Sequence, residues 1–537
     1  MSTRTALSIG NALLPQVFLL ASALGCATET DLVVIRNLEP GSSASGSASA
    51  PPTPPPTAPP APPPAPPPHG EWVTVAGGRM DDRANSVAVT ADGAVVTGRY
   101  EAMATFGTTQ VSGSRRHASL FLAKYKEGSG EFAWVTTSAT VECQRSDEER
   151  PLPCSNGLAV AVNPVDDSIC LGGYFAGKLR LAPGVPPVHS TRPDVVDGFV
   201  SKLDRDGRLL WFQALRGTGN QETRAIGANL DGGCTAAGTF RGEMRYWDGA
   251  NRVTSPHGWH DSLFLAKYDA VGGGEWIVTA GGPHADIEAR GLAFGPAGDV
   301  VLTGRSWGPN VTFGSRGIPG PTNAISSTER SAFLARYSGD GDLRWALRVG
   351  DEATRSGGKS VAMDLAGNAY VTGYVNSTGR KIRFGSIAGA SRPHDPVGWD
   401  DAFVAKYRPN GRLAWAKLLG STAGDDTGWG VAVDALGSVL VTGGLEGDVR
   451  FSGKEHTNLG GPGNSDVFLA RYDVRGRPQT LRVDGSRGRE EAGRALAISP
   501  LAGRIYVAGT LAGGGSLTPV QWGESDAFLA SFPAEPP

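Results

Sequence analysis

One stretch of the chain, residues 400–443, decides the fold: DDAFVAKYRPNGRLAWAKLLGSTAGDDTGWGVAVDALGSVLVTG. It holds a strand of the form F-x-A-K-Y at Phe403, a tight turn and an apolar strand around Trp415. From Val431 there follow an alternating strand, a glycine-containing turn and a second strand that ends in T-G. Alternation with a period of two around a glycine turn is the signature of a β-hairpin. We name the four predicted strands a (VAVD), b (ending in T-G), c (F-x-A-K-Y) and d (the Trp strand).

This unit recurs about every 65 to 70 residues, and self-similarity of that period is typical of repeat architectures. Strand c recurs at Phe121, Phe199, Phe264, Phe333, Phe403, Phe468 and Phe528. Strand d carries Trp72, Trp134, Trp211, Trp276, Trp345 and Trp415, with Leu481 in the seventh slot. Seven units of four antiparallel strands predict an all-β, seven-bladed β-propeller, whose closed ring leaves only short sheet edges.

The order of strands along the chain predicts how the ring closes. The repeat region, residues 71–537, opens with a d strand at Trp72 and ends with a c strand at Phe528, so one blade lacks a strand at each end. We expect the strand of Trp72 to complete the last blade beside Phe528. The N- and C-terminal segments of the propeller would then share one sheet.

The units resemble the SBBP β-propeller repeat of bacterial surface proteins, through the D-A-F-V-A-K-Y, G-x-x-x-W and V-A-V-D-x-x-G-N-x-Y-V-T-G elements. The resemblance covers essentially residues 70–532, and residues 400–443 match best. It implies a propeller fold and no established chemistry. Units two, three and seven depart from the pattern, through NLDGGCTAAG at Asn229 and Leu481 in place of Trp. These blades are expected to be the least regular.

Residues 1–26 have the features of an export signal. Arg4 lies in a short polar start, and the apolar run from Leu13 to Leu24 is too short to span a bilayer. The run ends in Ala-Leu-Gly-Cys, which resembles a bacterial lipobox and makes Cys26 the expected lipidation site. Ordinary signal cleavage and an uncleaved anchor are the alternatives. Ala27 after the cysteine favours the outer membrane, by resemblance to Gram-negative lipoproteins.

Residues 27–70 form a linker of low complexity, rich in Gly and Ser and then in Pro. The run PPTPPPTAPPAPPPAPPP at Pro51–Pro68 cannot build a core. As polyproline II it makes a semi-rigid spacer of about 55 Å. We interpret it as a stalk, with a ligand for a proline-binding module as the alternative.

Antiparallel order separates the connections onto two rims. The a–b and c–d turns share one rim and are tight, whereas the b–c segments share the other rim with the d–a links and are long and variable. Binding residues usually lie on variable loops held by a rigid scaffold. The rim of the b–c segments, called the long-loop rim below, is the predicted binding face. The stalk is expected to enter on the opposite, tight-turn rim.

Four tryptophans outside the repeat fall in or beside the b–c segments: Trp247, Trp259, Trp307 and Trp399. Exposed indole rings stack on sugars and anchor protein partners, so these are the candidate ligand-binding residues. The alternative is that they cover the apolar underside of the long segments.

Acidic residues recur in the d–a links, at Asp81, Asp82, Glu222, Asp286, Asp351, Glu352, Asp425, Asp426, Glu490 and Glu491. A catalytic constellation is normally unique, so a residue repeated by blade favours a structural role in turns. The same holds for Asp197, Asp401, Asp466 and Asp526, which precede strand c. We therefore assign no catalytic, cofactor-binding or metal-ligating residue. Structural calcium is an alternative, although no D-x-D-x-D-G loop occurs.

Other classes of site have little support. His257 and His260 lie close together, but two histidines without a cysteine pair are a weak metal signature. The net charge of -3 and the scattered 50 Lys+Arg argue against a nucleic-acid partner.

Five cysteines suit an exported protein in which one is lipidated and four remain. Cys143 and Cys154 flank a short insertion in the first d–a link and are expected to form a disulfide. Cys170 and Cys234 lie in b strands of successive blades, three and four residues before Gly173 and Gly238, hence at opposite parity. A bridge and two buried thiols are both compatible with that spacing.

The sequence thus predicts an exported, lipid-anchored, monomeric module on the outer membrane or cell surface. Its expected function is non-enzymatic recognition of a cell-surface protein or polysaccharide through the long-loop rim. A glycan hydrolase or lyase is the first alternative, because propellers host such chemistry and a fold does not decide function. A passive structural envelope lipoprotein is the second.

Overall fold

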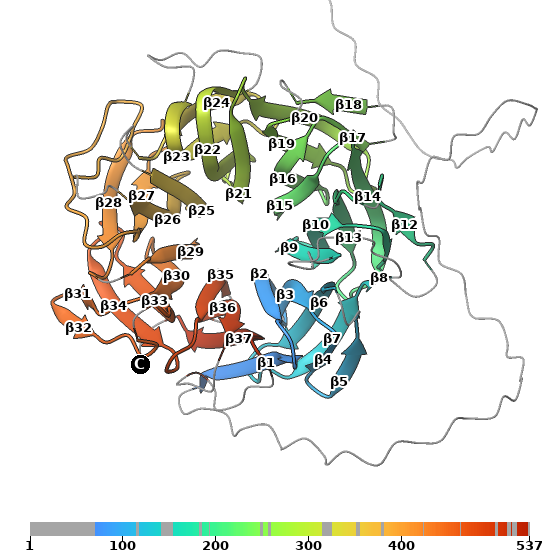
Figure 1. The fold of residues 1–537 in the computed structure, drawn as a ribbon, viewed down its shortest axis with the longest axis horizontal. Coiled ribbons are helices and arrows are strands. Elements are labelled where there is room, and N and C mark those ends of the chain that lie inside the picture. The colour runs from blue at the N-terminus through green and yellow to red at the C-terminus, as the bar shows by residue number, and fades with distance from the viewer. Residues whose placement is uncertain are drawn as a thin grey trace, which may run out of the picture. The chain divides into compact units, whose positions relative to one another are not determined.

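The structure is a computed structural model and describes residues 70–534, apart from gaps at 114–116, 141–153, 182–184, 193, 248–250, 256–258, 314–324, 351–354, 377–380, 423, 462, 500–502, 513–516 and 518–522. These residues form seven four-stranded antiparallel blades arranged in a ring, as the sequence predicts (Figure 1). Strand a of each blade lies innermost and strand d outermost. Within the described part of the chain, no helix is long and apolar enough to cross a membrane.

In blades 1 to 4, strands a, b, c and d follow one another along the chain. Blade 1 consists of β2 (Arg83–Thr90), β3 (Gly93–Tyr100), β6 (Ser119–Lys126) and β7 (Phe132–Thr137). Blade 2 consists of β9 (Ser155–Val162), β10 (Ile169–Phe175), β13 (Asp197–Leu203) and β14 (Leu209–Gly217). Blade 3 consists of β15 (Gln221–Ala228), β16 (Cys234–Arg241), β19 (Asp261–Tyr268) and β20 (Gly274–Gly281). Blade 4 consists of β21 (Asp286–Phe294), β22 (Val300–Phe313), β23 (Ile325–Tyr337) and β24 (Leu343–Arg348).

The last three blades follow the same plan, except that strand d of blade 7 precedes blade 1 in the chain. Blade 5 consists of β25 (Arg355–Met363), β26 (Ala369–Asn376), β27 (Asp401–Tyr407) and β28 (Leu413–Leu419). Blade 6 consists of β29 (Thr427–Val433), β30 (Val439–Leu445), β33 (Asp466–Tyr472) and β34 (Pro478–Asp484). Blade 7 consists of β35 (Ala492–Ser499), β36 (Arg504–Leu511), β37 (Asp526–Pro533) and β1 (Trp72–Gly78).

Blade 7 confirms the predicted closure of the ring. Strand β1 pairs antiparallel with β37, in a register that runs from Trp72 opposite Ser531 to Ala76 opposite Ala527. Gly70, the first described residue, accepts a hydrogen bond from the guanidinium of Arg504 at the start of β36. The described chain therefore begins on the tight-turn rim, as expected for the entry of the stalk.

The repeat tryptophans join neighbouring blades. Each packs against the glycine in the c–d turn of the next blade; a Cβ on Gly272, whose φ is +90°, would lie 2.9 Å from the Trp211 ring. The Trp211 indole N–H also donates to the carbonyl of Ala270 in that turn, at 3.0 Å. Leu481 is the d-strand residue of blade 6, and its neighbour, blade 7, has no c–d turn because β37 and β1 come from opposite ends of the chain. A tryptophan at position 481 would therefore have no c–d turn to pack against.

In five blades the cation of the F-x-A-K-Y motif fixes the a–b turn of its own blade. Lys124 pairs with Asp92 at 2.7 Å, and Arg336 pairs with Asp299 at 2.6 Å. The equivalent pairs are Lys267 with Asp231, Lys406 with Asp364 and Arg471 with Asp434. Strands b and c thus carry a buried apolar core, and one ion pair holds the turn at its end.

The b–c segments of blades 1, 2, 3 and 6 contain additional strands, and in blades 1 to 3 these pair with the outer strand of the preceding blade or with the link that follows it. The additional b–c strands are β4 (Met103–Phe106), β5 (Thr109–Ser112), β11 (Lys178–Arg180), β12 (Val188–His189), β17 (Glu243–Trp247), β18 (Asn251–Thr254), β31 (Val449–Phe451) and β32 (Lys454–His456). Strand β8 (Ala139–Thr140) lies in the d–a link after blade 1, and β31 and β32 form a separate two-stranded sheet. Strand β4 pairs with β1, β11 with β8 and β17 with β14. These segments therefore bind neighbouring blades to each other, in addition to shaping the long-loop rim.

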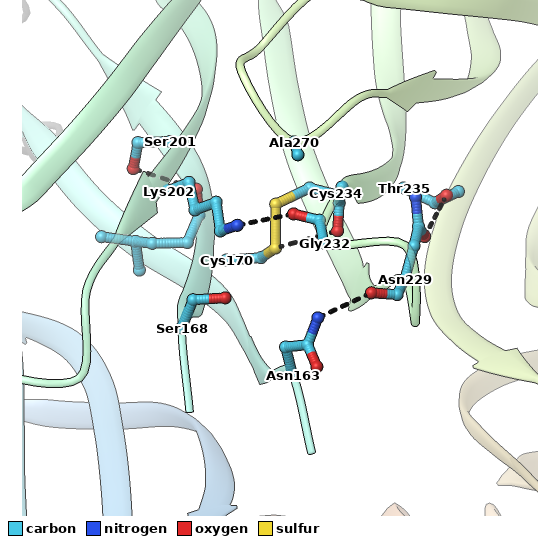
Figure 2. Close-up of a disulfide and its surroundings, with 12 residues drawn as sticks. Asn163, Ser168, Cys170, Ser201, Lys202, Asn229, Gly232, Cys234, Thr235 and Ala270 are labelled. Carbon is cyan, nitrogen blue, oxygen red and sulfur yellow. Dashed lines mark hydrogen bonds between the residues drawn. A yellow bond between two sulfur atoms is a disulfide. The ribbon is translucent and has the colours of Figure 1, made fainter. Parts of the chain in front are cut away.

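A disulfide between Cys170 and Cys234 joins blades 2 and 3, and settles the alternative that the sequence left open. Figure 2 shows the bridge, with the two Cα atoms 6.0 Å apart. Opposite parity turns the two side chains to opposite sheet faces, and these are the faces that adjacent blades present to each other. Next to the bridge, the Lys202 ammonium donates to the Gly232 carbonyl at 2.6 Å and the Asn163 amide donates to the Asn229 carbonyl at 2.8 Å.

The expected irregularity of blade 3 is wrong at its a–b turn. Asn229 and Gly233 close this turn with the same backbone hydrogen bonds that Asp364 and Asn368 make in blade 5. Asn229 simply occupies the Asp position. The turn of blade 2 is the longer one, since it closes between Asn163 and Ser168 and places Asp167 at a φ of 56°.

Candidate functional site

Every strand a contains a β-bulge at the same position, and the extra residue faces the central channel. The bulged residues are Asn85, Leu158, Arg224, Arg290, Lys359, Trp429 and Arg494. A bulge inserts one unpaired residue into a strand and re-aims its side chain. All seven residues line one cavity of about 320 Å³ along the ring axis. They lie nearer the start of strand a, and so in the half of the channel towards the long-loop rim.

The channel mouth is strongly cationic. Four bulge positions carry Arg or Lys. Arg83 and Arg99 of blade 1 are close enough to Arg494 to repel it, and Arg305 of blade 4 is close enough to Arg290 to repel it. Three carboxylates contact these cations. Asp81 pairs with Arg83 at 3.0 Å and Arg99 at 2.8 Å, and Glu222 pairs with Arg224 at 2.6 Å. The third, Glu288, contacts Arg290 at 2.5 Å and Arg305 at 3.0 Å. Positive charge therefore exceeds the negative charge in direct contact with it.

Two cations, Lys359 and Arg494, make no ion pair with any residue that the structure describes. They lie against Trp429, with the Lys359 ammonium 3.8 Å and the Arg494 guanidinium carbon 5.2 Å from the ring centroid. Arg494 also donates to the Thr510 hydroxyl at 3.2 Å. A ring face attracts cations but carries no net negative charge. An anion bound beside this pair would favour the protonated form of both groups.

Burial and mutual repulsion lower the pKa values of two arginines in the site. Burial and the neighbouring Arg224 lower the pKa of Arg290 to about 10, and burial and Arg83 lower the pKa of Arg494 to about 10. Burial alone would raise the pKa of Glu288, but Arg290, Arg305 and Arg224 outweigh it and bring that pKa to about 2. Glu288 is therefore a permanent anion that holds two arginines, unsuited to act as a general acid or base near neutral pH.

None of the four candidate tryptophans lines the central cavity. Trp259 and Trp399 are 88% and 75% exposed, just before the c strands of blades 3 and 5. Trp247 lies on β17 and packs over Gly274, and Trp307 lies on β22 with the guanidinium groups of Arg305 and Arg330 over its ring. No ring contact joins any two of the four in the described structure. Trp259 and Trp399 remain candidates for ligand contact on the long-loop rim.

Of the recurrent acidic residues, Asp81 and Glu222 pair with arginines, whereas Asp82 and Asp426 bind backbone amides. Asp82 accepts from Gly78 and Glu101, at 2.6 Å and 2.9 Å, and Asp426 accepts from Ser421 and Glu446, at 2.5 Å and 2.9 Å. The aspartates that precede strand c act likewise, since Asp197 accepts from Thr191, Asp401 from Val397 and Gly398, and Asp466 from Leu459 and Gly460. The described residues contain no group of three or more His, Cys, Asp or Glu that could hold a metal ion.

These buried carboxylates predict a pH-dependent stability. Burial is the main cause that raises the pKa of Asp82 to about 8, and those of Asp426 and Glu491 to about 7. A folded-state pKa above the unfolded value means that the stabilisation is complete below about pH 4 and is lost as the pH rises through the folded value. We expect the melting temperature to be at least about 2 °C higher at about pH 5 than at about pH 8.

The variant Asp426→Asn tests this assignment, because it removes one titrating group without changing the shape of the side chain. Thermal melts at both pH values should show a smaller difference for the variant than for the parent chain. A parent protein whose melting temperature is constant or rises from about pH 5 to about pH 8 would contradict the prediction.

Several predicted residues lie outside the described part of the chain. They are Cys26, Cys143, His257, Asp351 and Glu352, together with the proposed signal of residues 1–26 and most of the linker. Cys154 is disulfide-bonded, which is compatible with the expected partner Cys143.

The channel residues were not predicted as site residues, although the sequence carries a signal for them. Each bulge residue precedes a small residue, Ser, Ala or Gly, that begins the alternating part of strand a, as in Lys359-Ser360-Val361. Within this well-repeated segment it is the one position that varies between Asn, Leu, Arg, Lys and Trp. A variable position inside a regular repeat is where a repeat protein can place ligand contacts without disturbing its core.

No family model matches the chain. Among curated proteins it is similar to the regulatory protein FlaEY of Caulobacter vibrioides, with 32% identity over 141 residues, covering 26% of this chain and 14% of FlaEY. It is also similar to an uncharacterised WD repeat-containing protein, L264, of Acanthamoeba polyphaga mimivirus, with 25% identity, 40% of this chain and 15% of that protein. The chain thus spans only a small part of the length of either relative.

Three solved structures with similar folds cover most of the chain at low identity. An ulvan lyase of polysaccharide lyase family PL25 covers 86% of this chain and 96% of its own, at 11% identity and a TM-score of 0.43. A protein of unknown function from Dyadobacter fermentans covers 87% and 100%, at 12% identity and a TM-score of 0.39. The Dos1 propeller covers 86% and 96%, at 10% identity and a TM-score of 0.36. The strand order and register of this chain establish it as a seven-bladed β-propeller with a cationic central channel.

Proposed function

We propose that this chain is an exported, surface-displayed binding module without catalytic activity, which recognises an acidic polysaccharide at the long-loop rim. The SBBP-like repeat and the lipobox-like end at Cys26 support display of a single propeller on a lipid-anchored stalk at the outer membrane or cell surface. Entry of the chain at the tight-turn rim supports the same arrangement, because the long-loop rim is then free to meet a ligand.

One observation carries this proposal: Lys359 and Arg494 lie in the channel without a carboxylate partner among the described residues. Removing a charge from water without a partner is costly, and that cost is offset when a ligand supplies the opposite charge. Carboxylate and sulfate groups form short, charge-assisted hydrogen bonds with Lys and Arg. An anionic ligand should therefore both bind at this position and stabilise the ring.

The size and surroundings of the channel favour a sugar acid over a folded protein partner. A cavity of about 320 Å³ is at the small end of ligand pockets and accepts one sugar residue rather than a protein loop with its backbone. Trp259 and Trp399 are exposed on the same rim, where their rings can stack on further sugar residues. Recognition of an acidic protein segment is the competing outcome of the test below.

The test is a glycan array together with thermal shift measurements on the full chain, using carboxylated, sulfated and neutral polysaccharides. We expect acidic polysaccharides to bind and to raise the melting temperature, and neutral ones to do neither. The double variant Lys359→Gln and Arg494→Gln should weaken binding about 30-fold, equivalent to about 2 kcal/mol. Trp259→Ala and Trp399→Ala should weaken it by a smaller factor, with stability unchanged.

A matched control distinguishes the effect of this site on binding from the effect of the net charge of the protein. Arg205→Gln and Arg412→Gln remove the same charge from exposed positions on the tight-turn rim and should leave binding intact. Single-stranded DNA serves as a generic polyanion and should bind more weakly than the acidic polysaccharide. Equal loss of binding in both double variants, or equal binding of neutral glycans, would refute the proposal.

A polysaccharide lyase is the second candidate, because cations that can neutralise a uronate carboxylate lie beside Lys359 and Tyr374. Neutralising the carboxylate makes the neighbouring carbon acid easier to deprotonate, and a neutral amine can act as the base. The ultraviolet absorbance of an unsaturated uronate would appear during incubation with a bound polysaccharide if this second function holds. Binding without any such product supports the non-enzymatic module.

A further inference from the structure

Lys359 occupies an unusual position for a lysine. It is the bulge residue of β25, lines the central cavity, and lies with its ammonium 3.8 Å from the Trp429 ring centroid and 5.4 Å from the Tyr374 ring centroid. The Tyr374 ring comes from β26, which pairs with β25, and the Trp429 ring comes from β29 of the next blade. Its amine therefore faces a polar cavity between apolar walls.

The lysines of the c strands show what an ordinary buried lysine does in this fold. Lys124 pairs with Asp92, Lys406 pairs with Asp364, and Lys202 donates to a backbone carbonyl. Each has an acceptor that holds the proton on the ammonium. Lys359 has no such acceptor among the described residues.

Of the charged groups that face Lys359, all but one disfavour its protonated form. Arg290 approaches from β21, Arg305 from β22 and Arg494 from β35, and burial together with these three cations holds the pKa of Lys359 well below its ordinary value. Glu288 on β21 acts in the opposite direction, but it is already bonded to Arg290 and Arg305. Lysines desolvated beside other cations are the ones that act as nucleophiles near neutral pH.

We infer that Lys359 captures, as a reversible imine, ligands that carry an aldehyde or ketone beside a carboxylate, that is, α-oxo acids. The amine nitrogen donates its lone pair to the carbonyl carbon and a carbinolamine forms. This intermediate then loses its oxygen as water, with both amine hydrogens, and a C=N bond replaces the C=O bond. No oxidant or reductant takes part. Arg290 and Arg494 would hold the carboxylate.

This covalent step goes beyond the proposed binding function, and its readout is independent of polysaccharide binding. The full chain is incubated with glyoxylate and cyanoborohydride at about pH 7, and each lysine is then assayed for carboxymethylation by peptide mass spectrometry. We expect Lys359 to be modified at least about 10-fold faster than Lys406, since each unit of pKa depression increases the neutral fraction tenfold.

Two variants and one neutral probe make the result decisive. Lys359→Met should abolish the fast modification while circular dichroism and the melting curve show a folded ring. Arg494→Gln should slow modification by glyoxylate more than modification by glycolaldehyde, because glycolaldehyde lacks the carboxylate and feels only the change in the Lys359 pKa. If Lys359 is modified no faster than Lys124 and Lys406, or if glycolaldehyde reacts as fast as glyoxylate in the parent chain, the inference is wrong.

Discussion

We expect deletion of residues 71–76 to unfold the whole propeller instead of trimming one edge. These residues supply most of β1, which is the outer strand of blade 7 and pairs with β37 over five residues from Trp72 to Ala76. Strand β1 also pairs with β4 from blade 1, and the Trp72 ring covers Gly130 in the c–d turn of blade 1. Its loss would expose an edge strand and also open the contact between the first and last blades.

Circular dichroism melts and size-exclusion chromatography on the truncated and full chains measure this effect. The point variant Trp72→Ala offers a graded version and should lower the free energy of unfolding by about 3 to 5 kcal/mol, because Trp72 is only 4% exposed. Deletion of six residues from within Pro51–Pro68 is the matched control and should leave the melt unchanged. A β1-deleted chain that melts within about 2 °C of the full chain would show that the ring does not depend on this closure.

We expect removal of the Cys170–Cys234 disulfide to lower the free energy of unfolding by about 4 kcal/mol, from the chain-entropy model, because the bridge closes a segment with a sequence separation of 64. The best variant is Cys170→Val with Cys234→Ala, since blade 1 has Val95 and Ala94 at the equivalent positions. This choice replaces buried sulfur with side chains that the same repeat already packs, and so limits the cavity left behind.

Chemical denaturation of the parent and the double variant, with and without a reductant, measures the contribution of the bridge. The parent should fall to the level of the variant once it is reduced, and the variant should not respond. Hydrogen exchange should accelerate mainly in blades 2 and 3, because the bridge joins only these two. A variant as stable as the oxidised parent, or a loss spread evenly over all blades, would contradict this role.

Much of the fold could be predicted because each signal is local and repeated. The F-x-A-K-Y strand at Phe403 and the hairpin that starts at Val431 each specify a strand or turn from adjacent residues, and seven copies specify the ring. The structural role of Asp401 and Asp426 was also predictable, since a residue that recurs at a turn usually bonds the turn backbone.

The candidate site was predictable only in part. The long-loop rim was identified from the length of its segments, and Trp259 was expected there and is exposed. Lys359, Trp429 and Arg494 were not identified, because their meeting depends on the bulges in three separate blades. Nothing in the spacing of about 70 residues between them indicates a contact until the ring is closed.

By itself, the sequence determined the number of blades, the role of each strand, the pairing of the first strand with the last and the rim at which the chain enters. All of these depend on short patterns that act within one blade. The tertiary structure decided the Cys170–Cys234 bridge, the reason for Leu481 and the cationic channel. Each of these depends on which face of one blade meets the next, and that geometry exists only when all seven blades are packed around a common axis.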